Sequence, residues 1–125
     1  MEQEDYLETI YNLSKGKGYV RISDIARDLC LSKPSVTQMM QRLKKDGLVE
    51  YKPYQPLLLK PKGKQIGKMV AERHHVLAGF FTLLGIPKNI QEKDIHGIEH
   101  YLSPTTLKKL KTVTGFLRRK KYRDL

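Results

Sequence analysis

The chain has 125 residues, of which 39% are hydrophobic, so it can bury one compact core with a helical extension but not two large independent domains. Its 24 lysines and arginines against 13 aspartates and glutamates leave a formal net charge of +11, which indicates a polyanionic partner such as nucleic acid. A single cysteine, Cys30, excludes an intramolecular disulfide framework, and no apolar run approaches the roughly 20 residues that span a bilayer. We therefore expect a cytoplasmic protein with no export signal and no membrane segment.

Three helices are predicted in the N-terminal part of the chain. Apolar side chains recur at three- and four-residue spacing over 4–14, and a shorter helical pattern covers 22–29. After a brief turn, a third helix runs over 34–45, because Pro34 is tolerated in a first helical turn and Asp46-Gly47 ends the pattern. Such a succession of helix, helix, turn and helix is typical of a helix-turn-helix.

Two short β-prone runs follow the third helix. They cover 48–51 and 57–59, and the prolines of 52–56 mark a turn between them. This pattern predicts a two-stranded hairpin. A hairpin placed directly after a helix-turn-helix predicts the winged form of that motif.

The C-terminal half is predicted to be helical. A long helix begins at Pro61 and continues to about residue 84, a second covers about 89–102, and a third follows Pro104. The fold class is therefore mainly α, a winged helix-turn-helix with a two-stranded wing plus a helical dimerisation domain. We expect the DNA-binding domain to span 1–62 and the metal-binding and dimerisation domain 63–125.

Polar side chains gather on the predicted outer face of the third helix. Hydroxyl and amide groups there can hydrogen-bond base edges or phosphates, and lysine and arginine surround them. The alternative is a polar, solvated face on an ordinary three-helix unit. Wing residues are expected to contact the DNA backbone or the adjacent minor groove. The candidate DNA-binding residues are Ser32, Lys33, Pro34, Ser35, Thr37, Gln38, Gln41, Arg42, Lys52 and Tyr54.

All four histidines lie outside this candidate DNA reader, at positions 74, 75, 96 and 100. His74 falls on the apolar stripe of the long helix. A histidine in such a place is more often a hydrogen-bonded core residue than a ligand, so His74 alone leaves both interpretations open.

Further metal-ligand residue types recur at helical spacing. His96, Glu99 and His100 stand at i, i+3 and i+4, and Asp5 and Glu8 share a face of the first helix in the same way. Imidazoles and carboxylates from three helices can surround one or two divalent cations, whereas carboxylates brought together without a cation would repel each other. The sequence therefore favours a metal site.

The sequence shows no sign of catalysis. It has no serine or cysteine nucleophile in a recognisable setting, no phosphate-binding glycine loop and no zinc-protease spacing. We therefore expect that the protein is not an enzyme and takes no small organic substrate.

Motifs at five places carry a family resemblance, at 4–11, 32–37, 62–64, 73–74 and 97–100. Together they resemble the diphtheria-toxin-repressor family of metal-dependent regulators, most closely its manganese-transport-regulator branch, over nearly the whole chain. The resemblance implies the shorter architecture of that branch, without the SH3-like domain of iron-sensing members.

The resemblance also implies a ligand set. The metal ligands of the manganese branch correspond here to Asp5, Glu8, His74, Glu99 and His100, with the position of His96 completing the site. The iron branch usually has methionine where Asp5 stands, and a hard oxygen there favours manganese. At His96 this sequence departs from the pattern, since the manganese branch usually carries glutamate and the iron branch cysteine. That departure leaves open the metal, the number of ions, and whether His75 is the ligand instead.

The function implied by the resemblance is a manganese-responsive repressor of metal-uptake genes that binds double-stranded operator DNA as a homodimer. The cofactor is then a divalent metal ion, manganese, with iron, zinc or cobalt as alternatives. Metal binding is expected to draw the first helix toward the C-terminal helices and so fix the spacing of two recognition helices. Two other interpretations stay open, a metal-independent architectural DNA-binding protein and an iron- or zinc-responsive member of the same family.

Overall fold

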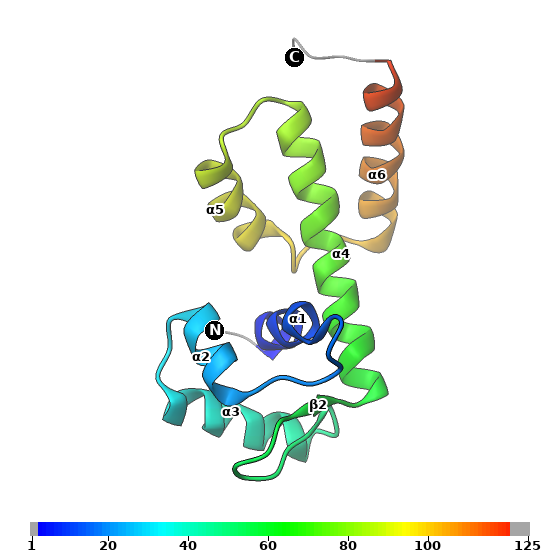
Figure 1. The fold of residues 1–125 in the computed structure, drawn as a ribbon. Helices are drawn as coiled ribbons and strands as arrows, with labels where there is room; N and C mark the ends of the chain where they lie inside the picture. The colour runs from blue at the N-terminus through cyan, green and yellow to red at the C-terminus, as the bar shows by residue number, and fades with distance from the viewer. Residues whose placement is uncertain (1–2, 121–125) are drawn as a thin grey trace. The chain divides into compact units, whose positions relative to one another are not determined.

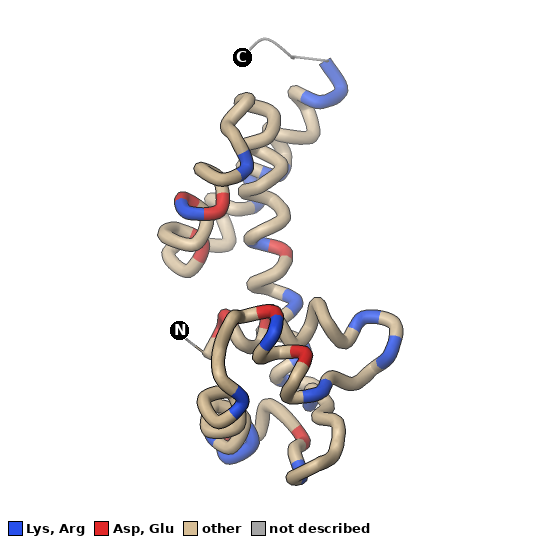
Figure 2. The backbone as a smooth tube through the Cα atoms, turned by 60° about the vertical axis from the view of Figure 1, so that its left-hand side comes forward, with Lys and Arg blue, Asp and Glu red and all other residues tan. Residues whose placement is uncertain are grey.

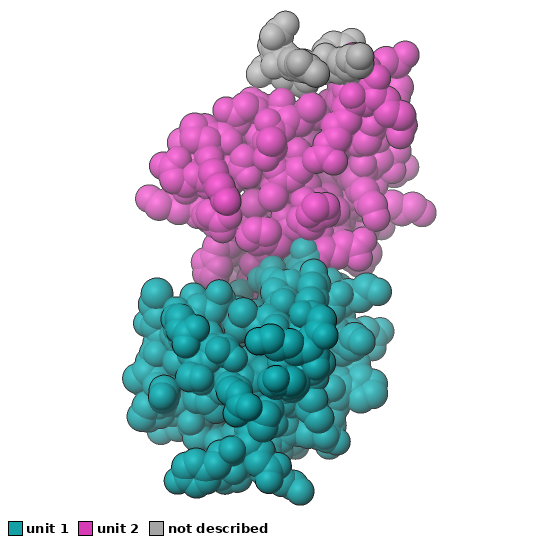
Figure 3. Space-filling view, in the orientation of Figure 1, with its two compact units in different colours: residues 1–71 teal, residues 72–125 magenta. Residues whose placement is uncertain are grey.

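In the computed structural model, residues 3–120 are described, and they form a mainly helical protein with one two-stranded sheet (Figure 1). The chain divides into two compact units, 1–71 and 72–125 (Figure 3). The fold class predicted from the sequence is confirmed. The helices are α1 (Gln3–Ser14), α2 (Ile22–Leu29), α3 (Lys33–Lys45), α4 (Pro61–Leu83), α5 (Lys88–Ile98) and α6 (Pro104–Arg119), and the strands are β1 (Val49–Glu50) and β2 (Leu58–Leu59).

The first three helices of unit 1 enclose a hydrophobic core. Ile10 of α1, Ile25 of α2 and Val36 of α3 are completely buried there. The start of α3 follows from local chemistry, because Ser32 is its N-cap and accepts a hydrogen bond of 3.2 Å from the backbone N–H of Ser35. These signals explain why the beginning of this helix could be predicted so closely.

The wing is shorter than predicted. Strands β1 and β2 pair antiparallel, with Val49 opposite Leu59, and a further bridge joins Val20 to Leu57. The predicted strands reached Tyr51 on one side, but Pro53 and Pro56 stand in the connection, and proline cannot donate to a strand ladder. The hairpin is therefore anchored by few backbone bonds and by its buried side chains.

The first turns of α4 pack very closely against the rest of unit 1. A Cβ atom built at Gly63 would collide with the carbonyl oxygen of Leu48, and one at Gly67 would collide with the carbonyl oxygen of Leu7. Both obstacles are backbone atoms, which cannot rotate away. Glycine at these two positions is what permits α4 to begin against the wing and α1.

Unit 2 consists of the second half of α4 with α5 and α6. Helix α5 ends at Ile98, four residues before the predicted end. Ser103 has an extended backbone because it is the N-cap of α6, where its hydroxyl accepts from the N–H of Thr106. The chain must therefore leave the helix before Ser103. None of the described helices has the length and apolarity needed to cross a membrane.

Candidate nucleic-acid interface and metal cluster

Helix α3 separates its buried and exposed residues by face. Val36, Met40 and Leu43 are completely buried and hold the helix to the core. The opposite face carries the residues predicted to contact DNA. Ser32, Lys33, Pro34, Ser35, Gln38, Gln41 and Arg42 are exposed, and Thr37 is half-buried.

The wing residues predicted to contact DNA are also exposed. Lys52 and Tyr54 lie in the connection between β1 and β2, and Tyr54 has a positive φ of 65° that directs this tight turn. A hollow of about 520 Å³ lies within unit 1 and is shared by α3, the wing and the start of α2. Its lining includes Arg21, which the sequence analysis missed, although a basic residue directly before α2 was the available signal.

The electrostatics of α3 suit a polyanion. The helix contains Lys33 in its first turn and Arg42, Lys44 and Lys45 in its last, with no acidic residue between them. The acidic residue that follows, Asp46, accepts a hydrogen bond of 2.9 Å from the amide of Gln3. Figure 2 shows lysine and arginine in the loop after α1. Such positive charge can neutralise phosphates and release their counterions.

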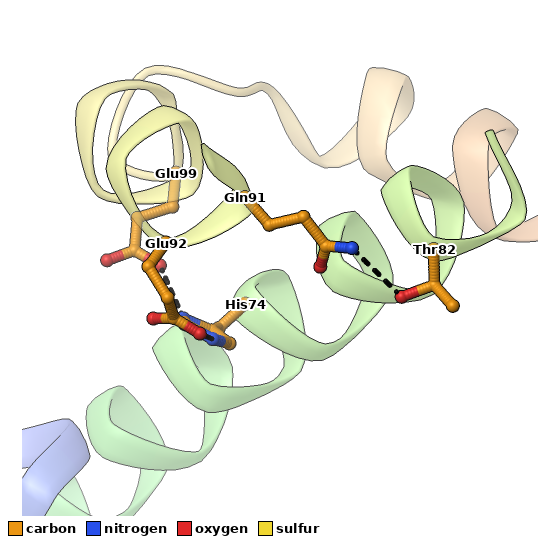
Figure 4. A network of polar contacts seen from close by, with 5 residues as sticks. All are labelled: His74, Thr82, Gln91, Glu92 and Glu99. Carbon is orange, nitrogen blue, oxygen red and sulfur yellow. Dashed lines mark hydrogen bonds and ion pairs between the residues drawn. The ribbon is translucent and has the colours of Figure 1, made fainter. Parts of the chain in front are cut away.

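In unit 2 the structure gathers three of the predicted metal ligands. His74 of α4 has its Nδ1 3.4 Å from Oε2 of Glu99 (Figure 4). His100 has its Nε2 3.6 Å from Oε1 of the same carboxylate. Although α5 ends at Ile98, Glu99 keeps helical dihedral angles and its N–H bonds to the carbonyl of Ile95 at 2.8 Å. Glu99 therefore keeps the helical spacing that the sequence predicted, although it lies one residue beyond the end of α5.

Glu99 is the residue of this cluster whose buried carboxylate most requires a compensating cation. Its side chain is only 2% exposed, and within the described residues its Oε2 is buried without a hydrogen-bond partner. An ionised carboxylate buried in this state is costly unless a positive charge compensates it. Two imidazoles and a carboxylate are a donor set that binds divalent transition metals. The cluster therefore fits a divalent metal ion.

The other histidines differ in their surroundings. His96 is exposed on the last turn of α5, and its ring lies edge-on to that of His100 with the centroids 6.5 Å apart. His75 is exposed on α4, about 100° around the helix from His74. These positions agree with a surface role for His75.

The two remaining predicted ligands belong to unit 1. Asp5 and Glu8 stand almost one turn apart on α1, where Asp5 is buried and Glu8 half-buried. Asp5 lies in the first turn of α1, where the helix dipole favours negative charge. Because α1 is helical at both positions, the two side chains share a helix face, as their spacing predicted.

The sequence analysis missed Glu92 of α5. Its Oε1 lies 3.9 Å from Nε2 of His74, on the other edge of the ring from Glu99 (Figure 4). The available signal was spacing, since Glu92, His96 and Glu99 stand at i, i+4 and i+7 and so share one face of a helix.

Together, the exposed basic helix with its wing and the separate helical unit with its buried carboxylate define a winged-helix DNA-binding protein with a ligand-binding helical unit. Comparison with known families agrees with this description. The N-terminal DNA binding domain of the iron dependent repressor family matches residues 1–57. The metal binding and dimerisation domain of the same family matches residues 60–124. The chain belongs to the iron dependent repressor family and is a transcriptional regulator.

Curated relatives extend the likeness. The chain is 43% identical over 113 residues to the HTH-type transcriptional regulator MntR of Listeria welshimeri, covering 90% of this chain and 80% of that protein. It is 42% identical over 113 residues to the regulator of the same name from Bacillus pumilus, covering 90% and 78%. Both relatives are named as transcriptional regulators and not as enzymes.

Solved structures share the fold. The crystal structure of IdeR from T. acidophilum superposes with a TM-score of 0.78 at 25% identity, over 92% of this chain and 55% of that one. The structure of the manganese regulator SloR has a TM-score of 0.76 at 23% identity, over 92% and 54%. This chain therefore spans about half the length of these two solved chains.

Proposed function

We propose that the chain is a manganese-responsive repressor of metal-uptake genes that binds operator DNA as a homodimer. The observation that carries the proposal is the buried Glu99 Oε2, which has no hydrogen-bond partner among residues 3–120 and lies 3.4 Å from Nδ1 of His74. This pair lies in the segment that matches a metal binding and dimerisation domain. The relatives named as MntR regulators support the same function.

The proposed metal ligands come from both predicted domains. The contacts among His74, Glu99 and His100 support three of them, and the family resemblance of the sequence supports the rest. When bound, the ion supplies the positive charge that the carboxylates require. Asp5 and Glu8 belong to the domain proposed for 1–62 and the other ligands to that proposed for 63–125, so shared coordination would restrict motion between the domains and reduce the ordering cost of binding DNA. The proposed set is Asp5, Glu8, His74, His96, Glu99 and His100.

The proposed DNA contacts are of two kinds, those that recognise base edges and those that position the protein on the DNA backbone. Side chains near the start of α3, such as Ser35 and Gln38, read base edges, because they are exposed on the helix that the motif presents to the major groove. Lys52 and Tyr54 of the wing fix the register through the backbone. The remaining proposed contacts are Ser32, Lys33, Pro34, Thr37, Gln41 and Arg42.

Apolar side chains on the surface of unit 2 support the proposed homodimer. Ile90, Ile98 and Tyr101 are exposed in and after α5, and Val113 and Phe116 are exposed on α6. Burial of such side chains against a second copy would be favourable. We expect the dimer to survive metal removal. Sedimentation of the metal-stripped protein as a monomer at micromolar concentration would contradict this part of the proposal.

Metal-dependent DNA binding tests the function directly. The metal-stripped protein would be titrated with manganese, iron, zinc and cobalt in the presence of a labelled DNA fragment from upstream of a metal-uptake gene of its own genome. We expect manganese to increase affinity and a chelator to reverse the effect. His74→Ala should abolish the response, whereas His75→Ala, which removes the exposed neighbouring imidazole, should retain it.

The other results separate the alternatives. Chelator-insensitive binding would identify a metal-independent architectural DNA-binding protein. A stronger response to iron or zinc than to manganese would identify a member of the family that senses one of those metals.

A further inference from the structure

His74 lies between two carboxylates that approach opposite edges of its ring. Nδ1 faces the buried Oε2 of Glu99 at 3.4 Å, and Nε2 faces Oε1 of Glu92 at 3.9 Å (Figure 4). The two carboxylates have different surroundings, since the side chain of Glu99 is 2% exposed and that of Glu92 is 55% exposed. One carboxylate is therefore buried and the other is hydrated.

A metal-binding histidine uses only one ring nitrogen for the metal. The other nitrogen carries a proton and usually donates it to a carboxylate, a carbonyl or water, which fixes the tautomer and the orientation of the ring. In this cluster Nδ1 points to the buried Oε2 of Glu99, which has no hydrogen-bond partner in the described part of the chain, so Nδ1 is the nitrogen on the metal side. Nε2 is then the protonated nitrogen, and it points to Glu92.

The position of Glu92 is secured by the residue before it. Gln91 is buried, and its amide donates to the hydroxyl of Thr82 at 3.2 Å and to the carbonyl of Ile86 at 2.7 Å. These bonds tie α5 to the end of α4 and the turn that follows it (Figure 4). The backbone of Glu92 is thus held beside α4, and rotation of its exposed side chain can bring the carboxylate from 3.9 Å into hydrogen-bond distance of His74.

We infer that Glu92 is a positioning residue that accepts the Nε2 proton of His74 and so directs Nδ1 toward the metal bound by Glu99. This inference rests on the proposed function, because it assigns Glu92 a role in metal affinity. Glu92 acts through His74 and does not itself bind the ion. Its carboxylate also adds negative charge close to the cluster, where His96 supplies none.

The test compares three variants of the full chain. Glu92→Ala removes the acceptor, Glu92→Gln keeps an acceptor oxygen without the charge, and Asp94→Ala removes an exposed carboxylate two residues along α5, about 200° around the helix. Manganese affinity would be measured by competition with a chromogenic chelator. The tautomer of His74 would be read from nitrogen-15 chemical shifts of the protein loaded with diamagnetic zinc, with circular dichroism to verify folding.

We expect Glu92→Ala to weaken manganese binding by about 10- to 100-fold, the usual effect of losing a partner of a metal-bound histidine. Glu92→Gln should restore most of the affinity, and Asp94→Ala should match the wild type. In the zinc-bound wild type Nδ1 of His74 should be the metal-bound nitrogen and Nε2 should carry the proton, and Glu92→Ala should produce a mixture of the two binding modes.

Two results would overturn the inference. Unchanged affinity or an unchanged tautomer in Glu92→Ala would show that Glu92 does not position the ring. A loss in Glu92→Gln equal to that in Glu92→Ala would show that the charge itself is required, as for a direct ligand. A wild-type protein that binds no divalent metal would instead defeat the proposed function, whereas a wild type that binds metal through Nε2 of His74 would defeat only this inference.

Discussion

The two units of the molecule differ in the extent of their apolar cores, although both also bury polar side chains, among them Asp5 and Thr9 in unit 1. The hydrophobic core cluster lies entirely in unit 1, where α1, α2, α3 and the wing contribute completely buried aliphatic residues. Among the described residues of unit 2, the buried hydrophobic side chains are Val76, Leu77 and Ile95, and they are accompanied by buried Gln91, Glu99 and Thr114. Both units expose some large apolar side chains.

This difference bears on how each unit is stabilised. Apolar burial of the kind seen in unit 1 stabilises a domain without any ligand. A buried carboxylate such as that of Glu99 becomes favourable when a cation compensates its charge. We therefore expect a bound cation to contribute a larger share of the stability of unit 2 than of unit 1.

The largest effect should come from the core of unit 1. Ile10 is completely buried, so Ile10→Ala should lower the free energy of unfolding of that unit by about 2–5 kcal/mol. Lys93→Ala, at an exposed polar residue of α5 in unit 2, should change stability by about 0.5 kcal/mol or less. Urea unfolding followed by circular dichroism would measure both. Equal losses in the two variants would show that the units do not differ in this way.

The second prediction concerns Glu99, the buried carboxylate of unit 2. Manganese at about 100 times its dissociation constant should stabilise the wild type by about 2.7 kcal/mol, through binding to the folded state. Glu99→Gln should lose this stabilisation, yet be at least as stable as the wild type without metal, because the substitution removes a buried charge.

A matched control is Glu72→Gln. Glu72 is exposed on α4 and pairs with Lys111 at 3.3 Å, so its loss should leave the stabilisation by manganese intact. Thermal unfolding with and without manganese would compare the three proteins. A Glu99→Gln variant that responds to manganese like the wild type would remove Glu99 from the proposed ligand set.

A third prediction concerns the recognition helix of unit 1. Gln38→Ala should cost about 1–3 kcal/mol of discrimination at one base position, because it removes a contact with a base edge. Lys62→Ala, at an exposed residue of the first turn of α4, should weaken binding to all sequences alike. Competition with operator variants at fixed salt would distinguish the two. If Gln38→Ala changed neither affinity nor specificity, the proposed recognition face would be incorrect.

The smallest effect is expected at His96, where the sequence departs from the family pattern. A carboxylate there adds negative charge beside His100, so His96→Glu should tighten manganese binding roughly tenfold, or about 1.4 kcal/mol, and shift the stoichiometry toward two ions per subunit. Calorimetric titration, followed by operator binding at matched free manganese, would measure both. Unchanged values would indicate that His96 faces away from the metal, leaving Asp5, Glu8, His74, Glu99 and His100 as ligands.

Local signals made much of unit 1 predictable. Pro34 located the start of α3, and helical periodicity located its buried face, because these features depend on neighbours in the sequence. The same periodicity placed Glu99 and His100 on the helix face of His96. The early end of α5 was missed, although Ser103 and Pro104 at the start of α6 were a local signal for it.

Features that depend on contacts between distant segments could not be predicted. Glu92 meets His74 only because Gln91 ties α5 to the turn after α4, and no local pattern encodes that packing. The close approach of Gly63 to the wing is of the same kind, since its cause is the carbonyl of Leu48. The ligand set as a whole therefore remains a prediction, to be tested by the substitutions above.

Cys30 offers a single site in this protein for attaching a spectroscopic label. It is the one cysteine of the sequence, it is exposed, and it caps the C-terminal end of α2 just before the recognition helix. A nitroxide attached to this thiol would place one spin label beside each recognition helix of a dimer without any background substitution. Pulsed dipolar spectroscopy could then record the distribution of distances between the two labels. With diamagnetic zinc in place of manganese, narrowing of that distribution would report how far metal restricts the two DNA readers.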